Sequence, residues 1–160
     1  MKPVQATLLI SNMNFADRPS FLAHGTAHQG SHPMADATHA NPLVLVVEDD
    51  ALLRMHAAEM IEEAGFRVLE APNADAAILL LESQMDIRII FTDIDMPGSM
   101  NGLKLAQAVA NRWPPIRIVA TSGHFKIRDG DLPTGGRFIA KPYRSNQIIS
   151  ALQELAGGAA

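Results

Sequence analysis

The chain has 160 residues, of which 48% are hydrophobic and 19% charged, and its formal net charge is −4. This length and balance predict one globular domain rather than a disordered chain, and the negative charge offers no basic surface for nucleic acid or an anionic membrane. Cysteine is absent, which excludes disulfides, thiolate zinc sites and cysteine nucleophiles.

The first part of the chain, residues 1–41, differs in composition from the rest. It is rich in Ser, Asn, His, Ala, Gly and Pro and shows no sustained hydrophobic periodicity, so we expect a flexible N-terminal extension. Four histidines lie in it: His24, His28, His32 and His39. Their irregular spacing favours solvated side chains over a metal site. Met34 leaves open a later translation start.

The sequence contains neither a convincing secretion signal nor a membrane span. Its opening stretch, "MKPVQATLLISNMNF", carries one lysine and only a weak apolar patch, which is too little for a signal peptide. No apolar run approaches the roughly 20 residues that a membrane-spanning helix needs. We therefore expect a cytoplasmic location.

From residue 43 onward, apolar segments of two kinds alternate along the chain. Short runs rich in Val and Ile indicate strands, and apolar residues spaced three or four apart indicate helices. In chain order the pattern predicts strand 43–47, a helix over about 51–64, strand 66–71, a helix after Asn73, strand 87–93, a helix over about 102–112, strands 116–122 and 136–141, and a helix over about 145–156. We expect Asp50 to cap the first helix and Gly65 to end it, and Pro114 to stop the third.

Most of the predicted strands are apolar on both faces, which is typical of a parallel sheet covered by helices on each side. Five such strands give an α/β fold, and right-handed crossovers leave only a few doubly wound arrangements. The segment 123–137 contains several glycines and a proline, so we expect a shortened or irregular fourth helix there. In such sheets ligands bind beyond the carboxyl ends of the strands.

Polar side chains follow four of the predicted strands at that edge. They are Glu48, Asp49 and Asp50 after the first strand, Asp93 and Asp95 at the third, Ser122 at the fourth and Lys141 at the fifth. Taken singly, each has an ordinary structural explanation, such as a helix cap, a turn residue or a solvated surface lysine. Their convergence on one edge from segments far apart in sequence favours a functional site.

Close carboxylates at the strand ends predict a cation. If Glu48, Asp49 and Asp93 lie together, at least one of their pKa values rises unless a positive charge is near. Oxygen ligands without histidine or cysteine favour Mg²⁺, which also recruits phosphate oxygens. A carboxylate in such a place can act as a nucleophile and form an aspartyl-phosphate. Lys141 and Ser122 could then stabilise the phosphoryl group.

In this order and spacing, the motifs resemble those of the receiver domains of two-component response regulators. The resemblance covers about residues 42–156 and rests on the acidic pair after the first strand, "DIDMPG" after the third, Ser-Gly after the fourth and Lys-Pro after the fifth. It implies a flavodoxin-like five-stranded parallel sheet with strand order 2-1-3-4-5. It also implies a phosphoacceptor signalling protein rather than an enzyme.

The resemblance assigns a role to each residue of the site. Asp93 would accept a phosphoryl group from a sensor histidine kinase or a histidine phosphotransfer protein, and Lys141 and Ser122 would contact that group. Mg²⁺ would be held by Glu48, Asp49, Asp93 and the backbone carbonyl of Asp95. Phosphorylation would draw Ser122 inward and let Phe138 rotate into the space it leaves. A plain core phenylalanine on an edge strand is the competing interpretation of Phe138.

Several features depart from the usual receiver pattern. Glu48 stands where many members have aspartate, and the loop "MPGSMNG" is one residue longer than usual. The irregular segment 123–137 lies where the output surface of receivers usually forms. The last predicted helix is followed by a short tail, residues 157–160, with no output domain after it. We therefore expect a single-domain response regulator that signals through protein contacts or serves as a phosphate relay or sink.

The partners implied are a phosphodonor kinase or phosphotransfer protein and an unidentified downstream protein, without nucleic acid or membrane. A homodimer through the last helix stays open. Two other functions stay open as well. The "DID" motif also resembles haloacid-dehalogenase-type phosphatases with Asp93 as nucleophile, although the acidic pair here precedes that motif. The other is an adaptor that has kept the receiver fold without phosphorylation.

Overall fold

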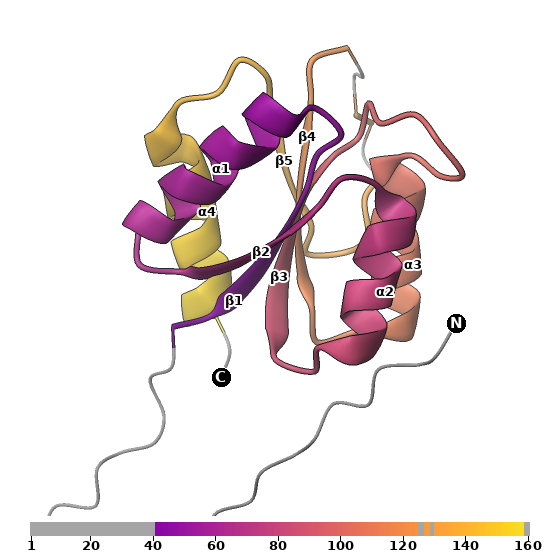
Figure 1. Ribbon diagram of the computed structural model, residues 1–160, viewed down its shortest axis with the longest axis horizontal. Helices are drawn as coiled ribbons and strands as arrows, with labels where there is room; N and C mark the ends of the chain where they lie inside the picture. The colour runs from indigo at the N-terminus through magenta and orange to yellow at the C-terminus, as the bar shows by residue number, and fades with distance from the viewer. Residues whose placement is uncertain (1–40, 125–126, 129, 159–160) are drawn as a thin grey trace, which may run out of the picture. The chain divides into compact units, whose positions relative to one another are not determined.

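The computed structural model describes residues 41–124, 127–128 and 130–158 (Figure 1). In chain order its elements are β1 (Leu43–Val47), α1 (Ala51–Glu63), β2 (Arg67–Ala71), α2 (Ala74–Ser83), β3 (Ile87–Asp93), α3 (Gly102–Arg112), β4 (Arg117–Ser122), β5 (Arg137–Ala140) and α4 (Ser145–Gly157). These bounds follow the predicted elements closely. The predicted N-terminal extension, apart from Asn41, and the last two residues of the predicted tail lie outside the described residues.

The five strands are parallel and lie in the order β2-β1-β3-β4-β5. This order confirms the predicted flavodoxin-like fold. Helices α1 and α4 cover one face of the sheet, and α2 and α3 cover the other (Figure 1). The carboxyl ends of all five strands therefore meet at one edge. None of the helices within the described ranges is long and apolar enough to cross a membrane.

Strand β1 is buried on both faces, which explains its continuous apolar run. Leu43, Leu45 and Val47 pack with α2 and α3, whereas Val44 and Val46 pack with α1 and α4. Successive side chains of a strand point to opposite faces of the sheet, so a strand between two helical layers needs apolar residues at every position. The acids that follow β1 are thus fixed to the most tightly packed part of the molecule.

Helix caps and turns fix the loops at the carboxyl edge. The Asp50 carboxylate accepts hydrogen bonds from the amides of Leu52 and Leu53 at 2.8 and 3.0 Å, which confirms its predicted role as the cap of α1. At the opposite edge of the sheet, Gly65, with φ of +91°, follows the end of the same helix and leads into β2. Asn101 caps α3 by accepting from an amide of its first turn at 3.0 Å. These contacts satisfy amides that a helix leaves without backbone partners.

The described residues between β4 and β5 contain no helix, where the glycine-rich sequence predicted a shortened or irregular one. Strand β5 lies at the edge of the sheet and is less buried than its neighbours. Phe138 and Ile139 are half-buried, and Ala140 is exposed. Ile139 packs on the side of α1 and α4. Strand β5 is thus only partly shielded from solvent.

The first residue of α3 packs directly against the backbone at the end of β3, where Asp93 lies. A Cβ atom at Gly102 would collide with the Asp93 carbonyl group, approaching its carbon to 2.7 Å and the Ile94 Cα to 2.9 Å. Because such contacts are not tolerated, we expect Gly102→Ala to lower the free energy of unfolding by about 1–3 kcal/mol. Urea unfolding measures this loss.

Gly157→Ala is the matched control, since nothing lies within 4 Å of an added methyl group there. We expect its unfolding midpoint to stay close to that of the wild type. An unchanged midpoint for Gly102→Ala would mean that α3 can move away from β3 without cost.

Candidate functional site

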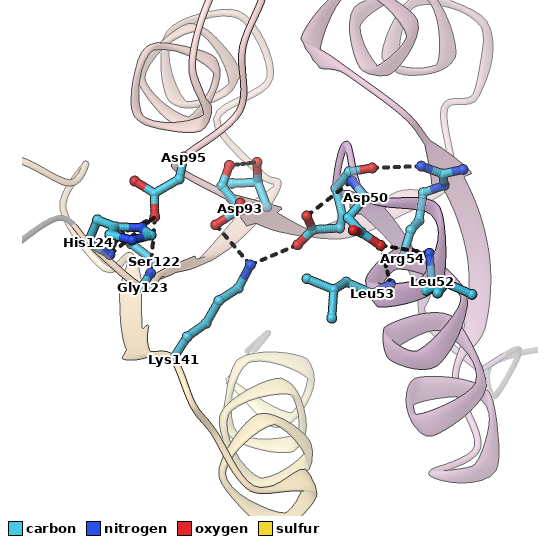
Figure 2. A network of polar contacts seen from close by, with 12 residues as sticks. Asp50, Leu52, Leu53, Arg54, Asp93, Asp95, Ser122, Gly123, His124 and Lys141 are labelled. Atoms are coloured by element: carbon cyan, nitrogen blue, oxygen red, sulfur yellow. Dashed lines mark hydrogen bonds and ion pairs between the residues drawn. The ribbon is translucent and has the colours of Figure 1, made fainter.

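The predicted residues converge on the carboxyl edge of the sheet, and Figure 2 shows much of this edge. Glu48 follows β1, Asp93 ends β3, Ser122 ends β4 and Lys141 follows β5. Three of these side chains belong to nearly inaccessible residues, with exposed fractions of 3% for Glu48, 4% for Asp93 and 2% for Ser122. Asp49, beside them, is exposed. The structure therefore brings together the acids, the hydroxyl and the lysine that the sequence placed at this edge.

Three carboxylates form an acidic cluster at the ends of the central strands. One oxygen each from Glu48, Asp49 and Asp93 lies within 4.8 Å of the others, an arrangement that could hold a metal ion. Asp93 Oδ1 is buried and accepts no hydrogen bond from the described residues, although the Lys141 ammonium lies 3.2 Å from it. An all-oxygen donor set that includes such a buried carboxylate oxygen fits a hard divalent cation such as Mg²⁺.

Lys141 supplies positive charge to this cluster. Its Nζ donates a hydrogen bond to Glu48 Oε2 at 2.9 Å and forms an ion pair with Asp93 Oδ1 at 3.2 Å. Burial by itself would lower the pKa of Lys141, but the hydrogen bond and charge of Glu48 and the charge of Asp93 outweigh burial and raise it. Lys141 therefore stays protonated next to the acids.

Glu48 is the carboxyl group on which burial acts most clearly. Burial raises the pKa of Glu48 above its ordinary 4.5, and the nearby Asp93 raises it further. The hydrogen bond and charge of Lys141 oppose this rise without cancelling it. Lys141 thus does not fully offset the burial of Glu48, and a divalent cation at the cluster would lower the cost of ionising Glu48.

Asp95 takes a position that the sequence did not predict. Its side chain turns to the end of β4, where Oδ2 accepts from the Ser122 hydroxyl at 2.7 Å and from the amides of Gly123 and His124 at 3.0 and 3.3 Å (Figure 2). Burial would raise the pKa of Asp95, but these donors outweigh burial and hold the pKa below its usual 3.8. Asp95 is therefore an ionised acceptor.

Arg54 is a residue beside the site that sequence reasoning missed. Its Nη1 donates to the backbone carbonyl of Glu48 at 2.8 Å, and its Nε lies 3.3 Å from Glu70 Oε2 on β2. The guanidinium therefore fixes the turn between β1 and α1 in which the acids lie. The sequence offered one sign of this role, an arginine in the first turn of a helix that follows an acidic strand end. Residue spacing alone, however, does not reveal that the arginine contacts a backbone carbonyl group.

A groove of about 480 Å³ opens beside Lys141. It is lined by Leu53, His56, Gly123, Lys141, Pro142 and Tyr143. The Tyr143 ring packs edge-on against Phe91 with the ring centroids 6.1 Å apart, and burial raises the pKa of its hydroxyl. Tyr143 is thus the aromatic residue beside the site, whereas Phe138, the predicted switch residue, lies half-buried on the edge strand β5.

The raised pKa of Glu48 links stability to pH in the metal-free protein. A carboxyl group with a higher pKa in the folded than in the unfolded state binds more protons when folded, so stability falls as the pH rises between the two values. The contribution of Glu48 is therefore full below pH 4.5 and is lost as the pH rises through the raised pKa.

In EDTA, we expect Glu48→Gln to flatten this part of the profile of unfolding free energy against pH, measured by urea unfolding from about pH 4 to pH 8. Glu62→Gln, an exposed position on α1, is the control and should follow the wild type. Parallel profiles for the wild type and Glu48→Gln would contradict this account.

Comparisons with known proteins agree with the geometry. The sequence model of the response regulator receiver domain matches residues 44–153. The response regulator receiver protein CpdR of Brucella abortus is 25% identical over 115 residues, which cover 70% of this chain and 94% of CpdR. The transcriptional regulatory protein PdtaR of Mycobacterium tuberculosis is 30% identical over 125 residues, covering 76% of this chain; the match spans 60% of PdtaR.

Solved structures give the same result for the fold. The response regulator TrrA of Thermotoga maritima, whose crystal structure is a complex with Mg²⁺-BeF, aligns with a TM-score of 0.65 at 22% identity, over 71% of this chain and 97% of TrrA. At that identity the likeness concerns the fold alone. The sequence model, however, matches well over half of the chain. The chain therefore belongs to the receiver domain family of two-component response regulators.

Proposed function

We propose that this receiver accepts a phosphoryl group on Asp93 from a phosphohistidine of a sensor histidine kinase or phosphotransfer protein, in a step that requires Mg²⁺. The observation that carries the proposal is the Lys141 ammonium, 2.9 Å from Glu48 and 3.2 Å from Asp93 within a cluster of three carboxylates. A lysine and a group of oxygen ligands are what phosphoryl transfer needs for charge neutralisation and positioning.

The acidic cluster is the proposed metal site. Glu48, Asp49 and Asp93 would bind Mg²⁺ through their carboxylates, and Asp95 would add its backbone carbonyl. When bound, Mg²⁺ would reduce the repulsion between the cluster and the incoming phosphoryl oxygens. The Mg²⁺-BeF complex of TrrA supports this assignment, since it comes from a protein with the same fold.

The remaining chemistry belongs to the side chains. A carboxylate oxygen of Asp93 attacks the phosphorus atom, and an O–P bond forms as the N–P bond of the phosphohistidine breaks. The bonding electron pair returns to the imidazole nitrogen, which takes up a proton. Lys141 stabilises the negative charge of the phosphoryl oxygens, and the Ser122 hydroxyl donates a hydrogen bond to one of them.

The groove beside Lys141 supports the approach of a protein donor. Asp93 has a side-chain exposure of 5%, so a donor histidine must reach it through an opening. The apolar rim of Leu53, Pro142 and Tyr143 provides a surface for such a partner. We expect the encounter in the cytoplasm, where kinases obtain ATP.

Output is proposed to pass through protein contacts with an unidentified partner or a second copy of the chain. Phe138 remains the proposed switch residue, since its half-buried position on β5 is compatible with two rotamers. The described part of the segment after β4 contains no helix, so no helix from that part covers the surface next to Phe138.

The arrangement does not favour a phosphatase. If the second aspartate of "DID" served a phosphatase as a general acid, it would need a raised pKa. Here the donors from Ser122 and the following amides hold the pKa of Asp95 below its ordinary value. An adaptor without phosphorylation is also less well supported, because the acids, lysine and hydroxyl are assembled at one edge.

Intact-mass measurement with acetyl phosphate and Mg²⁺ tests the proposed reaction. We expect one added phosphoryl group on the wild type and none on Asp93→Ala or in EDTA, because the acceptor or the cation is then missing. Asp86→Ala is the control, since Asp86 is an exposed acid that precedes β3 and pairs with Arg67. Labelling of Asp93→Ala, or sustained turnover of p-nitrophenyl phosphate by the wild type, would overturn the proposal.

Thermal unfolding in the presence of Mg²⁺ tests the metal site separately. A ligand that binds only the folded state at ten times its dissociation constant stabilises by about 1.4 kcal/mol, so the midpoint should rise with Mg²⁺. We expect Asp49→Asn to lose most of this rise. Asp50→Asn is the matched control, because asparagine also caps helices and Asp50 lies outside the cluster. An equal rise in all three proteins would contradict the assigned site.

A further inference from the structure

The carboxylate of Asp95 gathers three donors from the end of β4. Its Oδ2 accepts from the Ser122 hydroxyl at 2.7 Å and from the amides of Gly123 and His124 at 3.0 and 3.3 Å (Figure 2). The His124 Nδ1 lies 3.7 Å from the same oxygen, on a side chain that is largely exposed. One oxygen therefore ties the loop between β3 and α3 to the start of the segment that follows β4.

The contact with Ser122 has a defined direction. An ionised carboxylate only accepts hydrogen bonds, and a serine hydroxyl has a single hydrogen to donate. The hydrogen in the 2.7 Å contact is therefore the one that Ser122 carries. Under the proposed function, a phosphoryl oxygen on Asp93 needs the same hydrogen. Two acceptors thus compete for one donor.

The backbone of Ser122 is held independently of this competition. Its carbonyl accepts from the Lys141 amide at 2.8 Å, and the residue pairs with Ala140 of β5. Exchange of the hydroxyl between two acceptors therefore requires rotation of the side chain and leaves the strand pairing intact. Gly123 and His124, in contrast, follow the last residue of β4. Both amides donate to Asp95, and the His124 amide also donates to the Ser122 hydroxyl oxygen at 3.1 Å.

From these contacts we propose that Asp95 is a positioning residue that holds Ser122 away from Asp93 until a phosphoryl group competes for its hydroxyl. This inference rests on the proposed function of Asp93. Loss of the Ser122 hydrogen bond removes the shortest of the contacts between Asp95 and the end of β4. Rotation of Ser122 also changes the 3.1 Å hydrogen bond that its hydroxyl oxygen accepts from the His124 amide. Chemistry at Asp93 is thereby coupled to the position of Gly123 and His124.

A simpler effect of Asp95 has to be separated from this one. Its negative charge would repel a phosphoryl group whatever Ser122 does, and removing the charge would then favour the phosphorylated state in any background. A double-mutant cycle with Ser122→Ala separates the two effects, because a contact through Ser122 disappears from the cycle when the hydroxyl is absent.

The measured quantity is the affinity for beryllofluoride, a phosphoryl mimic, determined by calorimetry at saturating Mg²⁺. We expect Asp95→Ala to bind about tenfold more tightly than the wild type, the scale of one hydrogen bond to a charged group that no longer has to be broken. In the Ser122→Ala background, Asp95→Ala should change the affinity little. Asp95→Asn keeps an acceptor oxygen of the same shape and should lie between the wild type and Asp95→Ala.

Asp75→Ala is the matched control. Asp75 also accepts from a serine hydroxyl at 2.7 Å, that of Ser99, but at an exposed position, and its loss should leave the affinity unchanged. Thermal unfolding of each variant confirms that it is folded, and Asp95→Asn provides the test if Asp95→Ala is not.

Different results would refute the positioning role of Asp95 and the proposed phosphorylation of Asp93. Equal tightening by Asp95→Ala with and without the Ser122 hydroxyl, or equal tightening by the Asn and Ala variants, would show repulsion alone and overturn the positioning role. Weaker binding by Asp95→Ala would also overturn it. A wild type that binds no beryllofluoride and takes no phosphoryl group from acetyl phosphate would instead refute the proposed function, and the positioning role with it.

Discussion

The contact on which the rest of this structure depends is the Lys141 ammonium between the buried carboxylates of Glu48 and Asp93. Unpaired buried charges cost several kcal/mol each, so the acids require a cation in reach. Lys141 follows the edge strand β5, and β4 lies between it and β3. Its long side chain therefore spans the end of β4, and the strand order of the sheet is what makes this contact possible.

The charges at this edge also explain why a cation and a phosphoryl group fit it together. Three carboxylates face one lysine, and burial raises the pKa of Glu48. A phosphoryl group adds roughly −1.5 to −2 charges, which would aggravate the imbalance, whereas a divalent cation adds two of the opposite sign. In the proposed function the two additions nearly cancel, so the edge can be phosphorylated without a large net change in local charge.

Much of this site follows from the sequence because it depends on strand ends. Once strands 43–47 and 87–93 are recognised as parallel, Glu48 and Asp93 must lie at one edge. The glycines between β4 and β5 likewise predict that a normal helix does not form there, and the described residues of that segment contain none. The contacts of Asp95 and Arg54 could not be predicted in the same way. They depend on which rotamer each side chain adopts and on which carbonyl or amide lies in reach, and hydrophobic periodicity carries no information about either.

Because β5 is less buried than β3, we expect local opening of the sheet to cost less free energy at β5 than at β3. Strand β3 is buried along nearly its whole length, whereas β5 is half-buried, paired on one side and followed by Lys141. Segments with few buried apolar contacts open at lower free energy than the core. The Asp93 carboxylate therefore lies at the end of a buried strand, whereas Lys141 follows a half-buried edge strand. We expect local opening at this edge to begin on the lysine side of the ion pair.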